Sequence, residues 1–98
     1  FRRGRCHVVQ INMGMIMEYK GYDSGFYVFE ITYGEYDQTG YAKVKEMANH
    51  VEQLLGPRDT KWKGESYLFR NNKSMETVWI TRFKFYEESD AILIRLTF

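Results

Sequence analysis

The pattern of hydrophobic positions is clearest from about Thr39 to Leu55, where it predicts an amphipathic helix. Apolar residues recur there at steps of three and four, which puts them on one stripe: Tyr41, Val44, Met47, Ala48, Val51, Leu54 and Leu55. Asp37 or Thr39 can cap the N-terminus through a side-chain oxygen. Gly56 and Pro57 then end the helix, since glycine accepts a left-handed cap and proline lacks an amide donor. We expect Val51 and Leu54 to face a sheet.

The other apolar segments are rich in β-branched and aromatic residues, which predicts strands. They cover residues 6–13, 26–33, 61–70, 77–86 and 91–98. We expect the first strand to continue to Tyr19 past a bulge at Gly14. Turn-forming residues join the strands at 20–25, 71–74 and 87–90. The order β-β-α-β-β-β predicts the α+β class, with a single antiparallel sheet of about five strands and one amphipathic helix packed on one face.

Alternation along the strands assigns side chains to the two faces of this sheet. The residues expected to meet the helix are Tyr27, Phe29, Ile31, Tyr33, Trp79, Phe83, Phe85, Ile92, Ile94, Leu96 and Phe98. The residues expected on the opposite, uncovered face are Trp62, Arg70, Arg82, Lys84, Tyr86 and Arg95. This set combines cations with aromatic rings and contains no acid, so it is the main candidate binding surface.

The composition is that of one globular domain spanning residues 1–98. Of the 98 residues, 44% are hydrophobic and 28% charged. No apolar run approaches the roughly 20 residues of a membrane span, so we expect no membrane association. The single cysteine cannot form an internal disulfide, and the N-terminus shows no signal-peptide pattern, which favours a cytoplasmic location.

Charge is unevenly distributed along the chain, although the net charge is only +1. Arg2, Arg3 and Arg5 form a basic N-terminal arm, whereas residues 18–53 carry seven acids against three lysines. Residues 61–84 are basic again, with six bases against two acids. A chain of this kind can present a basic face and an acidic face.

The residues that usually carry catalysis or bind metals are few and scattered. Cys6 and His7 are adjacent on a predicted strand and therefore point to opposite faces, so they cannot form a nucleophile–base pair. His50 follows Glu46 by one helical turn, which is the spacing of a weak surface pair. No zinc site, phosphate-binding loop or dinucleotide fingerprint is present. We therefore expect a non-enzymatic protein with no metal and no cofactor.

Two classes of binding partner remain. An open sheet face, exposed strand edges and eight tyrosines favour a protein partner, and self-association stays open. The alternative is nucleic acid, because arginine and lysine neutralise phosphates while Trp62 and Tyr86 can stack on bases. The N-terminal arm of Arg2, Arg3 and Arg5 would add contacts to the nucleic-acid backbone. The pI of about 8.0 is lower than that of a dedicated nucleic-acid-binding domain.

The C-terminal run of residues 83–98 combines an aromatic strand, an acidic turn, Asp90-Ala91 and a hydrophobic finish that contains Arg95. This segment, about a sixth of the chain, resembles the closing segment of small uncharacterised accessory proteins of tailed bacteriophages. The resemblance implies a small viral accessory or structural protein, located in the host cytoplasm. Its pattern allows a helix after Asp90-Ala91 with Ser89 as the cap, whereas β-branched Ile92 and Ile94 favour a strand.

Overall fold

A computed structural model describes residues 8–12 and 15–97, which form five strands and two helices. In chain order the elements are β1 (Val8–Asn12), β2 (Met15–Asp23), β3 (Phe26–Gly34), α1 (Gln38–Leu55), β4 (Trp62–Arg70), β5 (Thr77–Phe85) and α2 (Glu88–Thr97). No helix within the described ranges is long and apolar enough to cross a membrane.

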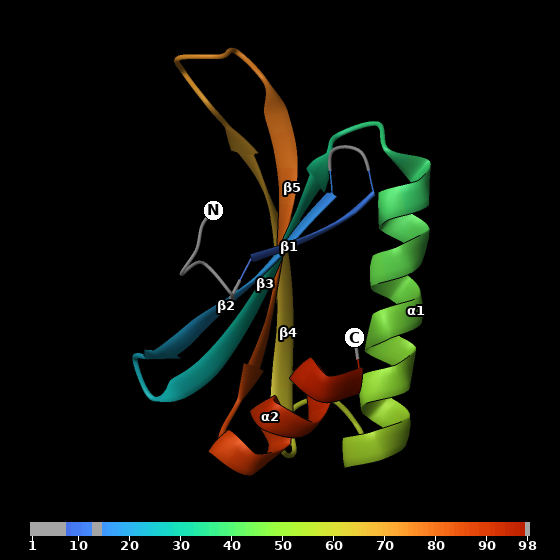
Figure 1. Ribbon diagram of the computed structural model, residues 1–98, viewed down its shortest axis with the longest axis vertical. Coiled ribbons are helices and arrows are strands. Elements are labelled where there is room, and N and C mark those ends of the chain that lie inside the picture. Colours follow the sequence, from blue (N-terminus) through green and yellow to red (C-terminus); the bar gives the residue numbers. More distant parts are fainter. Residues whose placement is uncertain (1–7, 13–14, 98) are drawn as a thin grey trace.

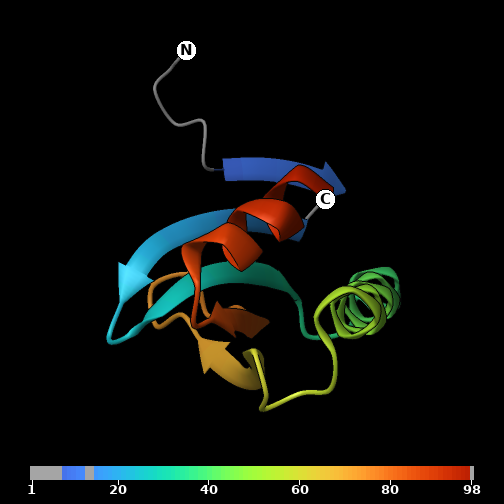
Figure 2. The ribbon, with the colours of Figure 1, turned by 90° about the horizontal axis from the view of Figure 1, so that it is seen from below.

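The strands form one antiparallel sheet in the order β1-β2-β3-β5-β4 (Figures 1 and 2). The predicted α+β class with a single antiparallel sheet is therefore confirmed. Because β5 inserts between β3 and β4, the two edge strands among the described residues are β4 and β1.

The first predicted strand is wrong as one continuous element. The chain reverses between Asn12 and Met15, which lie opposite each other, so the segment forms two antiparallel strands. The register of β2 against β3 shifts between Tyr19 and Gly21. The bulge expected at Gly14 lies outside the described residues. At the end of β2, Ser24 and Gly25 both have positive φ values, 55° and 93°, as a tight two-residue hairpin turn requires.

The predicted helix begins and ends close to the expected residues. Asp37 is the N-cap, and its side chain accepts a hydrogen bond of 2.9 Å from the Gly40 amide. A side chain at position 40 would place Cβ only 2.8 Å from Cβ of Tyr33, so glycine allows the first turn to lie against β3. At the other end, the Gly56 amide donates to the Glu52 carbonyl at 2.8 Å, and Gly56 has φ 98°.

The buried stripe of α1 contains Val44, Met47, Val51 and Leu55. The expectation for Val51 is confirmed, but that for Leu54 is wrong, because Leu54 is 44% exposed. The helix is rotated so that Leu55 takes the buried position, since successive residues lie about 100° apart around a helix.

The last predicted strand is wrong, because residues 88–97 form α2. Ala91 and Ile94 lie three residues apart, on one helical face, and both are buried against the sheet. Glu88 and Asp90 in the first turn and Arg95 in the last turn also complement the helix dipole. Ser89 lies within the first turn rather than before it.

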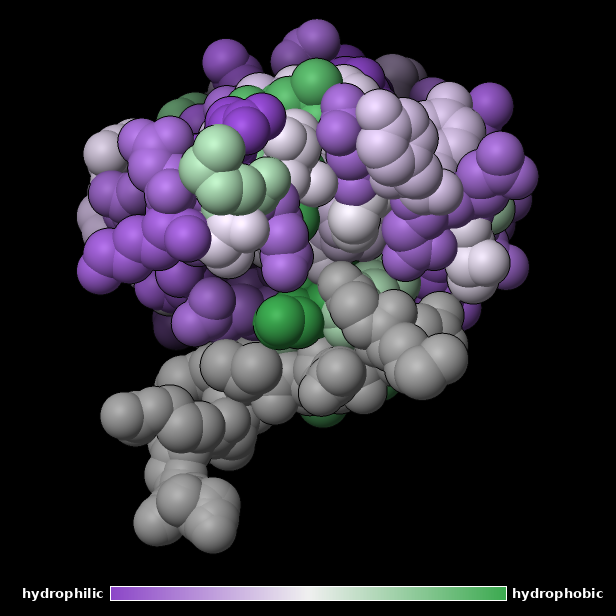
Figure 3. Space-filling model, turned by 90° about the horizontal axis from the view of Figure 1, so that it is seen from above, coloured by the Kyte–Doolittle hydropathy of each residue, from purple (hydrophilic) through white to green (hydrophobic). Residues whose placement is uncertain are grey.

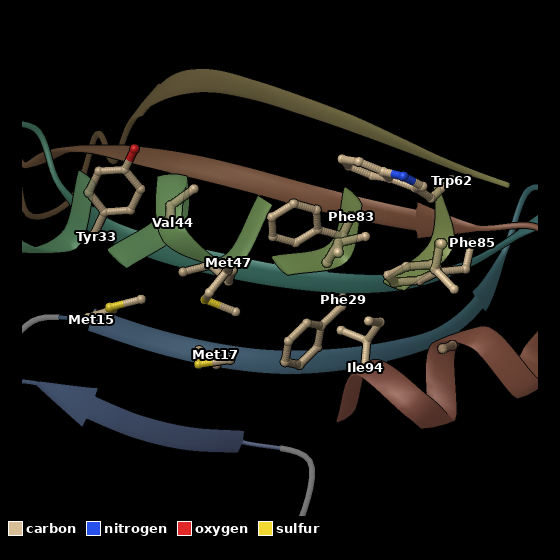
Figure 4. Packing of buried hydrophobic residues seen from close by; sticks show 14 residues of the cluster. Met15, Met17, Phe29, Tyr33, Val44, Met47, Trp62, Phe83, Phe85 and Ile94 are labelled. Carbon is tan, nitrogen blue, oxygen red and sulfur yellow. The ribbon is translucent and has the colours of Figure 1, made fainter. Parts of the chain in front are cut away.

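Both helices pack on the same face of the sheet (Figure 1). The sheet contributes to this core the side chains of Met15, Met17, Phe29, Ile31, Tyr33, Trp62, Phe83 and Phe85. In Figure 4, Ile94 of α2 lies beside Phe29 of β3, and Met47 projects from α1 into the same cluster. The faces predicted for β3 and β5 are confirmed, since Phe29, Phe83 and Phe85 belong to this core.

We expect Met47→Ala to lower the free energy of unfolding by about 2–5 kcal/mol, because Met47 is completely buried between α1 and the sheet. Leu54→Ala, on the same helix but 44% exposed, is the matched control and should change it by less than about 1 kcal/mol. Urea denaturation measures both. Equal effects of the two substitutions would contradict the helix orientation.

Candidate functional site

The uncovered face of the sheet carries an ion-pair network rather than a basic patch. Nε of Arg82 donates to Oε2 of Glu30 across the β3–β5 pairing at 2.9 Å. Nζ of Lys84 lies 2.7 Å from Oε1 of Glu65 on β4. Lys20 reaches Glu18 at 3.1 Å and Glu30 at 3.9 Å. Each cation in this network is therefore opposed by a carboxylate.

Burial makes the central pair the most firmly held. The Glu30 side chain is 12% exposed and that of Arg82 31%. The hydrogen bond from Arg82 to Glu30 raises the pKa of the guanidinium above its usual value. Because its guanidinium is hydrogen-bonded to Glu30, Arg82 is a poor candidate for binding an external anion.

Aromatic rings on this face contact the same cations. Arg82 lies over the Tyr67 ring at 5.9 Å from its centroid, and Lys84 over the Phe26 ring at 5.6 Å. Phe26 also contacts Tyr86, with ring centroids 5.0 Å apart. The rings therefore help to hold the cations on the sheet.

The structure separates most of the residues predicted for one binding surface. It brings together Arg82, Lys84 and Tyr86, but the expectation that this face lacks acids is wrong. Trp62 is misassigned: it pairs with Phe85, is 1% exposed and belongs to the core. Its indole nitrogen donates to the Gly56 carbonyl at 2.9 Å, which fixes the connection between α1 and β4.

The remaining predicted residues also lie elsewhere. Arg70 ends β4 and shares the strand parity of Trp62, so it is not on the uncovered face. Arg95 belongs to α2 and lies over the Tyr19 ring at 4.2 Å. Arg2, Arg3 and Arg5 of the predicted basic arm lie outside the described residues, as do Cys6 and His7.

A groove that the sequence did not indicate lies between α1 and β4, with a volume of about 290 Å³. The α1 wall includes Val44, Lys45 and Ala48, whereas Gly64 and Ser66 line the β4 side. It exists because α1 packs over β3 and leaves the helix-facing side of β4 uncovered beyond Trp62, which is itself in the core. A larger depression of about 450 Å³ follows the solvent face of α1 and is lined by that helix alone.

Hydroxyl groups form the floor of this groove. The Ser66 and Thr81 hydroxyl oxygens are 2.8 Å apart, and Thr81 also shares a hydrogen bond with Tyr33. Burial raises the pKa of the Tyr33 phenol above 10.0, and the bond to Thr81 acts in the opposite direction.

Outside the groove, burial also raises the pKa of the Tyr19 phenol, and the positive charge of Arg95 partly offsets this increase.

The outer edge of β4 borders the groove and has no neighbouring strand among the described residues. At the two ends of the hairpin, Tyr86 N–H donates to the Lys61 carbonyl and Asn71 N–H to the Glu76 carbonyl. Hydrogen-bonded pairs alternate along an antiparallel ladder, so odd-numbered residues of β4 direct their backbone groups to β5. Even-numbered residues direct theirs outward: Gly64, Ser66, Leu68 and Arg70.

The distal part of the β4–β5 hairpin extends beyond the N-terminal end of α1 (Figure 1). Tyr67, Leu68 and Phe69 are exposed there. Figure 3 views the molecule from this end, and hydrophilic side chains divide its apolar surface into separate spots. The continuous feature of this region is therefore the backbone edge of β4 rather than a broad apolar patch.

No group of three or more potential metal-ligating side chains is found in the part of the chain that the structure describes. No family model, no curated protein and no solved structure matches the chain.

A double-mutant cycle tests the Arg82–Glu30 pair. We expect Arg82→Met and Glu30→Gln to show a coupling free energy of about 1–2 kcal/mol in urea unfolding, because the pair is half-buried and hydrogen-bonded. The exposed Lys43–Glu46 pair, at 3.2 Å on α1, provides the matched cycle and should give less than about 0.5 kcal/mol. Identical couplings would contradict the importance of the pair on the sheet.

Alkaline titration tests the buried Tyr33 phenol. The unfolded chain releases this proton near pH 10 whereas the folded protein retains it to higher pH, so the free energy of unfolding should fall as pH rises above about 10. Tyr33→Phe should make this fall shallower, because it removes the buried phenol. Urea unfolding between pH 8 and pH 11 gives the slopes. A slope unaffected by Tyr33→Phe would contradict the burial argument.

Proposed function

We propose that this protein is a non-enzymatic protein-binding module that takes up an extended segment of a partner protein as an additional strand beside β4. The observation that supports the proposal is the uncovered backbone edge of β4, where four alternate residues direct amides and carbonyls outward. Strand addition at such an edge supplies main-chain hydrogen bonds, and adjacent grooves supply side-chain specificity.

The composition of β4 strengthens this proposal. Proteins protect exposed sheet edges with short strands, prolines or charged side chains, because a free edge templates pairing with another chain. β4 has nine residues and no proline, and its charged residues Lys63, Glu65 and Arg70 flank three consecutive exposed apolar side chains at Tyr67, Leu68 and Phe69. This apolar run is the part of the edge best suited to an added strand.

The nucleic-acid alternative is weakened at the sheet face, because Arg82 and Lys84 are paired with carboxylates and Trp62 is in the core. Its other component, the arm of Arg2, Arg3 and Arg5, lies outside the described residues, so nucleic acid is kept as an outcome of the test. A phage accessory role stays within the proposal through the C-terminal resemblance. The helical form of α2 agrees with the helix that this resemblance allows.

Proline substitution along β4 separates strand addition from other modes of binding. Peptides are first selected from a random twelve-residue display library with the immobilised full chain. Leu68→Pro removes an outward amide and spares the ladder to β5, so it should weaken selected peptides at least tenfold and leave the fold intact. Leu68→Ala removes the same side chain, keeps the amide and should bind nearly normally.

Amide hydrogen exchange in the unsubstituted chain provides a second measurement that does not depend on a variant. In the free protein the amides of Gly64, Ser66 and Leu68 should exchange quickly and those of Glu65 and Tyr67 slowly. A bound peptide should protect the first three. Failure to select any peptide, or equal binding by Leu68→Pro and Leu68→Ala, would overturn the proposal. So would a random single-stranded oligonucleotide that displaces the peptides.

A further inference from the structure

The groove beside the β4 edge carries positive charge without an internal counter-charge. Lys45 and Arg58 both line it, and neither makes an ion pair with another described residue. Glu65 is the one acid among the lining residues, and Lys84 engages its carboxylate at 2.7 Å. The charge that the groove offers to a ligand is therefore that of two cations.

Aromatic contacts hold these cations in place. The Arg58 guanidinium lies 5.4 Å from the centroid of the Trp62 ring, and Nζ of Lys45 lies 5.9 Å from that of Tyr41. Trp62 is itself fixed by its hydrogen bond to the Gly56 carbonyl. An aromatic ring attracts a cation but does not take up its N–H donors as a carboxylate would. The N–H donors of Lys45 and Arg58 are therefore available to a ligand carboxylate.

Gly64 sets the position of Arg58 relative to the edge. A Cβ at residue 64 would lie 3.6 Å from Nε and 3.7 Å from Cζ of Arg58, and 3.2 Å from Cζ3 of Trp62. The guanidinium thus lies over the backbone of an outward-directed residue of β4. In an added strand, the side chain opposite Gly64 points to the same face of the sheet, and toward Arg58.

We infer that the groove selects an extended acidic segment, with carboxylates on the alternate residues that face α1. One carboxylate, opposite Gly64, binds the Arg58 guanidinium, and a second on the same face of the added strand binds Lys45. This inference rests on the proposed function, because strand addition is what brings alternate side chains to the groove. The physical basis is electrostatic: the positive charges of Lys45 and Arg58 attract an acidic segment and repel a basic one.

Three fluorescein-labelled nine-residue peptides test the inference. They share a frame of threonine at every second position and differ only at the residues between, which are all glutamate, all glutamine or all lysine. Fluorescence anisotropy with the full chain should rank glutamate about tenfold tighter than glutamine, and lysine weakest. The preference for glutamate should decrease as salt increases, because the cations lie at the surface.

Charge reversal supplies the matched variants. Arg58→Glu, and independently Lys45→Glu, should abolish the preference for the glutamate peptide over the lysine peptide. Lys43→Glu makes the same change in net charge on α1, but Lys43 does not line the groove and pairs with Glu46, so the preference should persist. An effect of Lys43→Glu equal to that of Arg58→Glu would show a response to net charge alone and overturn the inference.

The outcomes separate this inference from the proposed function. If all three peptides bind equally and Leu68→Pro weakens all three, the acidic preference is wrong and strand addition stands. If neither these peptides nor any library peptide binds, the proposed function itself fails. If an oligonucleotide binds, loses affinity on Arg58→Glu and is unaffected by Leu68→Pro, the cations serve nucleic acid and the inference is overturned.

Discussion

The packing of α1 and α2 over β3 is the contact on which the rest of the structure depends. Ile31, Phe29 and Tyr33 of β3 lie in the same core as Met47 of α1 and Ile94 of α2. α1 contacts β3, and β4 lies two strand spacings, about 10 Å, from β3, which is about the full width of a helix. The burial that stabilises the fold therefore leaves the helix-facing side of β4 open beyond Trp62 and forms the groove.

Each face of the sheet solves a different physical problem. On the helix face, apolar side chains remove their surface from water. On the other face no described element covers the strands, and ion pairs between neighbouring strands link β2 to β3, β3 to β5 and β5 to β4. Such pairs contribute modestly to stability, but they oppose the cations with acids on one surface. As a result, the positive charge of Arg82 and Lys84 on the open face is neutralised, whereas Lys45 and Arg58 at the groove pair with no carboxylate among the described residues.

The glycine and tryptophan of β4 link folding to the candidate site. Trp62 extends the core toward the edge strand and fixes the connection from α1 through its bond to Gly56. Gly64 leaves room beside that ring, where Arg58 lies. The core residue and the groove cation are thus in direct contact, so the rigidity of the core orients a surface group. A site built in this way depends on a strand rather than on a loop for its geometry.

The sequence by itself determined α1 and its end at Gly56, because these depend on apolar spacing and on the backbone preferences of single residues. It offered Asp37 or Thr39 as the cap, and the structure decided for Asp37, with Thr39 inside the helix. It also determined the α+β class and the core faces of β3 and β5, where alternation is regular. Strand order and register were decided only by the tertiary structure: they place Glu30 and Glu65 beside Arg82 and Lys84, and Trp62 in the core. The last element was also decided by packing, since burial of Ala91 and Ile94 on one helical face outweighed the β-propensity of Ile92 and Ile94. Local spacing is encoded within a segment, whereas cross-strand neighbours and the uncovered edge of β4 come from contacts between residues that are distant in sequence.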